Sequence, residues 1–180
     1  MEITNSLIVH GGPYFPNLEE LVLSLGDFEG GVEELVSGKL VCDSFSCVKS
    51  LTLTFVDFDS SDVLGFMYEI IWGFPNLQTL TIKALSSDSY DHEDPSLELC
   101  TLMEQLQLLN VVLENFEGLE NELFFIKKLL ACTPLLKKFT IRPDPTLLFP
   151  GGYEEKFKVA KKLLRFQRAS AIADVDLDWS

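Results

Sequence analysis

One hydrophobic pattern recurs along the chain: an apolar residue, two variable residues, an apolar residue, one variable residue and a last apolar residue. Successive copies start 30, 29, 31, 28 and 36 residues apart, at Leu18, Val48, Leu77, Leu108, Leu136 and Ile172. Alternate residues of a strand point to opposite faces, so each copy predicts a short strand with one apolar face. One unit cannot bury that face alone, which predicts that neighbouring copies stack around a shared core.

Proline precedes three of these copies. The tetrapeptide Phe-Pro-Asn-Leu occurs twice, at 15–18 and at 74–77, and Thr133–Leu136 is a looser version. Proline ends a preceding helix and favours an extended backbone just before it. Two identical caps in the same register therefore indicate an internal repeat.

The segments between the predicted strands show helical periodicity. A helix over 62–72 can be capped by Ser60 or Ser61. Its apolar face would hold Val63, Phe66, Met67, Ile70 and Ile71. A second helix is predicted over 120–132, with one apolar side formed by Leu123, Ile126, Leu129 and Leu130.

A third helix is predicted over 153–168, after the Gly151-Gly152 doublet. Its inner stripe would contain Phe157, Ala160, Leu164 and the stem of Lys161. A shorter helix is predicted over 32–37, and the polar segment 86–95 is predicted to be an exposed loop. Strands that are joined by such long crossovers are expected to be parallel.

The Pro-Asn-Leu-x-x-Leu-x-Leu units resemble the irregular leucine-rich repeats of plant F-box proteins. The segments Val111–Leu123, Ile126–Leu130 and Pro134–Ile141, with the later Phe166–Ser170, are similar to the FBD region of that family. The resemblance covers roughly residues 15–180. It implies an α/β fold, an irregular leucine-rich-repeat solenoid with a short-stranded parallel sheet on one side and helices on the other. The chain then divides into a leucine-rich-repeat segment, 1–101, and an FBD-like region, 102–180, that continues the solenoid.

Regular leucine-rich repeats place Asn or Cys three residues after the last strand apolar, where the side chain satisfies buried backbone groups. Those positions are occupied here by Gly26, Val56, Leu85, Phe116 and Asp144. We therefore expect no ladder of side-chain amides in this chain.

In F-box proteins an N-terminal F-box docks on a Skp-type adaptor of a cullin–RING ubiquitin ligase, and the repeats hold the substrate. The resemblance thus implies a non-catalytic protein-recognition scaffold, like the substrate-binding part of a ubiquitin-ligase receptor. The 14 residues before Phe15 are too few to form an F-box. The alternative is a stand-alone or remnant interaction module with no ligase link.

The charge distribution bears on the kind of partner. Residues 1–122 carry 22 Asp/Glu and 3 Lys/Arg, whereas residues 123–180 carry 6 and 11. A field this acidic repels phosphate backbones, so we expect no nucleic-acid binding, although six cations at 156–168 leave a contact by the last helix as a weaker alternative. A protein partner with a basic patch would be steered to the first two-thirds; simple solubility is the other interpretation. No apolar run reaches the about 20 residues that a bilayer span needs.

Candidate chemistry is sparse. The two histidines, His10 and His92, have no Cys, Ser or second His at a ligand or relay spacing. The glycine doublets match no phosphate-binding loop. Four scattered cysteines and the lack of a basic N-terminal signal favour a cytoplasmic or nuclear location. We expect no enzyme activity, no cofactor and no metal site.

The strand residues that face away from the predicted core are the candidate partner-binding site. They would line a concave surface and comprise Glu20, Val22, Ser24, Ser50, Thr52, Thr54, Thr79, Thr81, Lys83, Asn110, Val112, Glu114, Lys138, Thr140 and Arg142. Solenoids commonly bind partners on such a surface. The alternative is that Thr and Ser are simply favourable strand residues that face solvent.

Overall fold

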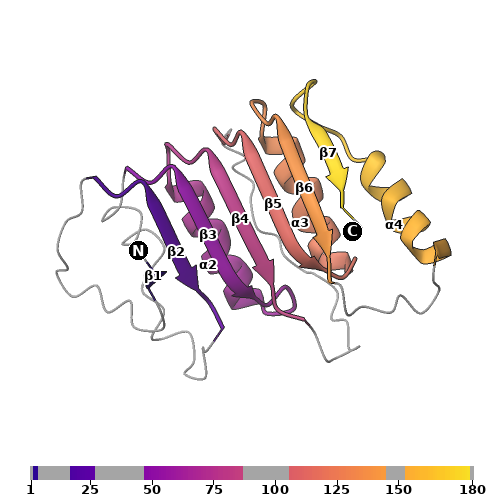
Figure 1. Cartoon of the computed structure of the whole chain (residues 1–180), viewed down its shortest axis with the longest axis horizontal. Helices are drawn as coiled ribbons and strands as arrows, with labels where there is room; N and C mark the ends of the chain where they lie inside the picture. Colours follow the sequence, from indigo (N-terminus) through magenta and orange to yellow (C-terminus); the bar gives the residue numbers. More distant parts are fainter. Residues whose placement is uncertain (1, 4–16, 27–46, 87–105, 145–152, 179–180) are drawn as a thin grey trace.

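A computed structural model describes residues 2–3, 17–26, 47–86, 106–144 and 153–178. They contain one parallel sheet, in which each strand lies beside the strand before it in the chain (Figure 1). The strands are β1 (Glu2–Ile3), β2 (Glu20–Ser24), β3 (Ser50–Val56), β4 (Thr79–Ala84), β5 (Asn110–Phe116), β6 (Lys138–Pro143) and β7 (Asp174–Leu177).

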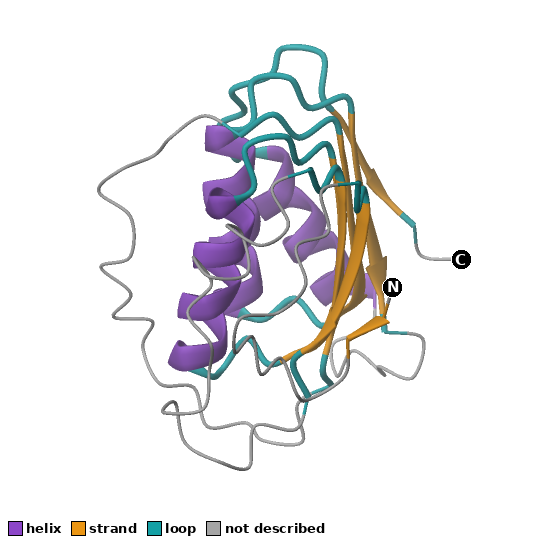
Figure 2. Cartoon of the chain, turned by 90° about the vertical axis from the view of Figure 1, so that its left-hand side faces the viewer, coloured by secondary structure: helices purple, strands orange, loops and turns teal. Residues whose placement is uncertain are grey.

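Three described helices connect the strands: α2 (Ser61–Gly73), α3 (Glu120–Cys132) and α4 (Tyr153–Leu164). They lie on one side of the sheet, and no described helix covers the other side (Figure 2). The Oγ of Ser60 accepts a hydrogen bond from the Val63 backbone N–H at 3.4 Å, which caps α2 as predicted. The predicted α/β fold, a parallel sheet with helices, is confirmed.

The recurring hydrophobic pattern becomes two rows of side chains that cross the sheet. The first row comprises Leu21, Leu51, Leu80, Val111, Phe139 and Val175. The second comprises Leu23, Leu53, Ile82, Leu113, Ile141 and Leu177. Neighbours in each row are register partners, because parallel strands bring equivalent repeat positions side by side. The pairing continues from β4 to β5, across the proposed boundary at 101/102.

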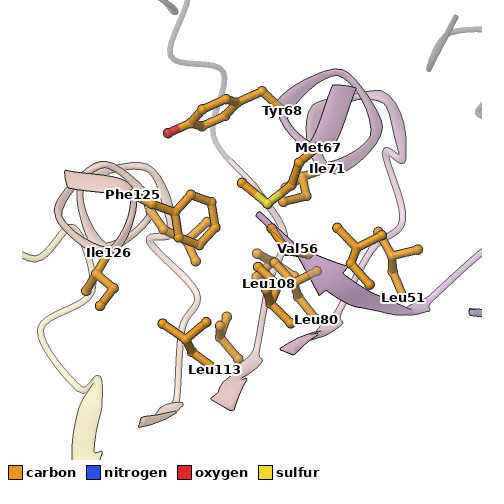
Figure 3. Close-up of a cluster of buried hydrophobic side chains, with 14 of the residues drawn as sticks. Leu51, Val56, Met67, Tyr68, Ile71, Leu80, Leu108, Leu113, Phe125 and Ile126 are labelled. Carbon is orange, nitrogen blue, oxygen red and sulfur yellow. The ribbon is translucent and has the colours of Figure 1, made fainter. Parts of the chain in front are cut away.

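These rows form the floor of the core, and the helices cover it. Met67 and Ile71 of α2 and Ile126 of α3 are fully buried and point toward the sheet (Figure 3). Leu51 and Leu80 are also fully buried, and burial of each such side chain stabilises the fold by roughly 1.5–3 kcal/mol. Phe66 of the predicted α2 face is only partly buried, at the edge of this cluster.

The predicted inner stripe of the last helix is wrong. Phe157 and Leu164 are 67% and 70% exposed, and it is Leu163 that is buried, with Val159 packed against the core. The helical period alone allows either Phe157 and Leu164, or Val159 and Leu163, to face the core. Val159 packs against the segment before α3, where a Cβ added to Gly118 would lie 3.3 Å from the Cγ2 of Val159.

This helix also ends earlier than predicted, at Leu164 rather than Arg168. The N–H groups of Arg165 and Phe166 donate to carbonyls three residues back, which closes the last turn. The Nη1 of Arg168 instead donates to the Ala173 carbonyl at 3.0 Å.

The sixth copy of the pattern departs from the others at its first position. Val48, Leu77, Leu108 and Leu136 are buried, but Ile172 is 73% exposed. Ala173 and Ser170 face inward instead, and the Ser170 Oγ donates to the Leu136 carbonyl at 2.7 Å. The longer spacing of 36 residues before this copy accommodates the different approach to β7. The helix predicted over 32–37 and most of the loop predicted over 86–95 lie outside the described residues.

Candidate functional site

The fifteen predicted site residues lie together on the sheet surface opposite the helices, which we call the open sheet face. Register partners join them across β2 to β6. One row contains Glu20, Ser50, Thr79, Asn110 and Lys138, and the next contains Val22, Thr52, Thr81, Val112 and Thr140. The structure therefore brings residues that are up to 122 positions apart in the chain onto one continuous surface.

One of the fifteen, Thr140, is buried rather than solvent-facing, at 7% exposure. The Nζ of Lys138 lies 3.5 Å from the Oδ2 of Asp176, which is the register partner of Thr140. Thr140 itself lies between β5 and β7, with Val112 and Asp176 as its register partners on either side. The prediction of an exposed Thr140 is therefore wrong.

The C-terminal half of the open sheet face carries a chain of ion pairs. Glu114 lies between two cations, 3.2 Å from the Nζ of Lys83 and 2.8 Å from the Nη1 of Arg142. Arg142 continues to the carboxylate of Asp178 at 3.6 Å. Charges thus alternate in sign from β4 to Asp178, the residue after β7.

The N-terminal half of the same face is mostly uncharged. Ser24, Thr52, Thr54 and Thr81 are half-buried hydroxyl residues on β2 to β4. The Oγ1 of Thr54 donates to the Leu23 carbonyl at 3.5 Å, across to the neighbouring strand. A partner would meet hydroxyl groups and the methyl or methylene groups of these short side chains in this half. Glu20 is the charged residue at its edge.

Phe55 stands at the end of this uncharged half and was not predicted. It occupies a register irregularity of β3, with a φ of 56° and 54% of its surface exposed. A left-handed backbone is unusual for a bulky residue and marks a strained position. Repeat spacing alone places Phe55 in a strand, so the sequence held no signal for this irregularity.

Asn115 of β5 occupies the equivalent repeat position, with a φ of 59°. Its Nδ2 donates to the Ala84 carbonyl at 3.1 Å, and Asn tolerates this backbone far better than Phe. Asn115 lies one residue before Phe116, which occupies the position where regular leucine-rich repeats carry Asn. At another such position, Asp144 accepts a hydrogen bond from the Ser86 Oγ at 2.6 Å.

Three aspartates extend the open sheet face beyond the predicted residues. Asp174 and Asp176 of β7 are register partners of Lys138 and Thr140, and Asp178 follows the strand. The sequence could have predicted these three aspartates. They occupy the same repeat positions in the sixth copy as the fifteen residues do in the other copies.

Glu122 has a strongly perturbed carboxyl group. It is 1% exposed, and its carboxyl oxygens accept from the backbone N–H groups of Glu117, Gly118 and Leu119, the closest at 2.7 Å. Burial raises the pKa of Glu122 to about 8, while these N–H groups act in the opposite direction. Its position beneath the start of α3 fits a capping role there.

The basic residues of the last helix partly pair with acidic groups. The Nζ of Lys162 lies 2.6 Å from Glu120 of α3, and Lys158 lies 3.5 Å from Glu154. Among the described residues no three His, Cys, Asp or Glu side chains gather as a metal site. Both histidines lie outside the described residues.

None of the described helices is long and apolar enough to cross a membrane. No family model, curated protein or solved structure matches the chain.

Proposed function

We propose that the chain is a non-catalytic protein-recognition scaffold that binds its partner on the open sheet face. The observation that carries this proposal is the continuity of that face: five adjacent strands contribute to it in register, and the described helices lie on the opposite side. A surface of aligned strands offers many side chains at fixed spacing, which suits recognition of another protein.

Charge indicates the kind of partner. The described residues 17–26 and 47–86, which contain β2 to β4, hold six Asp/Glu and two Lys. Of these carboxylates, Glu20 belongs to the open sheet face. The acidic segment as a whole would attract a partner with a basic patch, and salt would weaken the association by screening the charges. The charges on β4 to β6 already form ion pairs with one another. They would orient the bound partner, whereas the net negative charge would attract it.

Phe55 adds an anchor to this surface. Aromatic side chains that are held in place contribute disproportionately to binding, because little conformational entropy is lost when they are covered. Phe55 is both exposed and constrained, since its left-handed backbone and its contact with Gly26 restrict its movement. We therefore place the centre of the contact between Phe55 and the hydroxyl residues of β3 and β4.

The resemblance to plant F-box proteins refines the proposal. The parallel strands in chain order support the leucine-rich-repeat solenoid interpretation. On that interpretation the bound protein is a substrate presented for ubiquitination, and the alternative is a stand-alone module with no ligase link. Co-purification of the chain with a Skp-type adaptor would favour the first, whereas a partner bound without any adaptor would favour the second.

The proposal is tested by a charge placed in the middle of the open sheet face. Thr81→Arg should abolish the capture of proteins that the wild-type chain retains from a cell extract, as measured by quantitative mass spectrometry. Gln107→Arg adds the same charge at an exposed residue outside this face and should retain them. Equal retention by both variants, or no specific retention by the wild type, would contradict the proposal.

A further inference from the structure

Among the described residues, β7 is the last strand of the sheet, and its outer edge pairs with no other described strand. The N–H groups of Asp174 and Asp178 donate to β6 carbonyls, both at 2.9 Å. Backbone groups of alternate residues in a strand point to opposite sides, so those of Val175 and Leu177 point away from β6. No described strand lies beyond β7, and no described residue forms a hydrogen bond with these outward-pointing groups.

The side chains at this edge are also less covered than their equivalents within the sheet. Val175 and Leu177 are half-buried, whereas their register partners Phe139 and Ile141 are fully buried. Ile172, just before the strand, is 73% exposed. One more strand would complete the burial of the two core rows.

Charge determines which strand would fit. On the open sheet face, Lys138 and Arg142 of β6 pair with Asp176 and Asp178, so each strand here meets charges of opposite sign on the next. Asp174 is exposed and has no ion pair among the described residues. A following strand would continue the alternation if it carried cations on this face.

We propose that the β7 edge binds an extended segment of a partner protein in which Lys or Arg alternates with aliphatic residues, adding a strand to the sheet. The cations would face Asp174 and Asp176, and the aliphatic side chains would cover Val175 and Leu177. Strand addition of this kind derives affinity from backbone hydrogen bonds and specificity from alternate side chains. This inference goes beyond the proposed function, because it assigns a second partner to the β7 edge, far from the β3 and β4 residues where the proposed function places its contact.

A second copy of the chain is a poorer occupant of this edge. Two β7 strands side by side would place aspartates opposite aspartates, and like charges in cross-strand positions are destabilising. Charged residues at a sheet edge commonly prevent such self-association. The aspartates therefore select against the chain itself and for a basic segment.

The test uses a synthetic peptide in which four lysines alternate with three valines, with both ends blocked. In fluorescence anisotropy it should bind the full chain at least about tenfold more tightly than a peptide in which the lysines precede the valines, because only alternation matches the two faces of a strand. Hydrogen exchange of the Val175 and Leu177 amides should slow when the alternating peptide is added. Equal affinity for both peptides, or unchanged exchange, would overturn the proposal.

Two charge variants separate this edge from general attraction to an acidic protein. Asp174→Lys should weaken binding of the alternating peptide by about tenfold, since it reverses a cross-strand charge pair. Glu20→Lys makes the same change on β2, toward the other end of the sheet, and should leave the affinity unchanged. An equal loss in both variants would overturn the proposal, as would protection of Val175 that depends on protein concentration without peptide. Thr81→Arg, which tests the open sheet face, should not affect this peptide.

Discussion

Gly26 and Phe55 pack so closely that a side chain at position 26 would collide with Phe55. A Cβ added to Gly26 would lie 2.6 Å from the Cβ of Phe55 and 2.9 Å from its Cγ. The missing side chain at the end of β2 thus makes room for the exposed aromatic residue of β3. This contact links two consecutive repeats at the margin of the open sheet face.

Gly26→Ala should destabilise the fold by about 1–3 kcal/mol, as over-packing does elsewhere. The same substitution in a Phe55→Gly background should cost about 1–2 kcal/mol less, because the atoms that clash are gone. Urea unfolding of the four proteins measures this coupling. Additive losses would show that the two residues do not constrain each other.

Phe55→Asn should be at least as stable as the wild type, and about 1 kcal/mol more stable than Phe55→Ala, because Asn tolerates the left-handed backbone. Asn115 shows that this residue type fits the equivalent position of β5. The same variant should weaken partner capture by the open sheet face. Chemical denaturation compares the two variants, and an Ala variant as stable as the Asn variant would argue against backbone strain at this position.

Two adjacent leucines test the orientation of α4. Leu163→Ala should lower the free energy of unfolding by about 2–5 kcal/mol, because it empties a buried site. Leu164→Ala should change it by less than about 0.5 kcal/mol, since this side chain is 70% exposed. Thermal unfolding of both variants decides the matter. The opposite ranking would restore the inner stripe predicted from the sequence.

Stability should fall with rising pH through the titration of Glu122. Its pKa is about 8 in the folded chain, against 4.5 for the unperturbed group, so the folded state binds this proton more tightly than the unfolded state. The stabilisation that protonated Glu122 contributes to the fold is therefore complete below pH 4.5. It is lost as the pH rises towards about 8. The loss is on the order of 5 kcal/mol. Urea unfolding at a series of pH values measures it.

Glu122→Gln is the control for this prediction, because an amide of the same shape has no proton to lose. The difference in unfolding free energy between the variant and the wild type should grow in favour of the variant as the pH rises across that window. A difference that stays constant would mean that Glu122 does not titrate there, and that the backbone N–H groups outweigh its burial.

Glu114→Gln should cost about 1 kcal/mol at low salt, because Glu114 joins two cations and is only partly exposed. Most of this loss should disappear at about 1 M salt, where exposed charges are screened. Glu19→Gln breaks a single exposed pair with Lys49 and should cost less. Denaturation at two ionic strengths compares the variants, and salt-independent losses would contradict an electrostatic origin.

The parallel sheet and two helices could be predicted because they depend on local patterns. A repeat of apolar positions specifies which face of each strand is buried, and Ser60 and the α3 period specify where helices form. The fifteen site residues followed from the same alternation, and fourteen of them lie on the open sheet face with some solvent exposure. Thr140 is the exception: it is buried between its register partners Val112 and Asp176.

The sequence by itself determined the repeat, the strand faces and the acidic character of the first two-thirds, because each depends on the identity and spacing of residues along the chain. Only the tertiary structure decided which apolar pair of α4 faces inward, where β3 and β5 depart from regular register, and how the charges of β4 to β7 pair. Those outcomes depend on contacts between residues far apart in the chain. A pattern within one segment cannot specify them, because neighbouring alternatives such as Leu163 and Leu164 differ only in what they meet after folding.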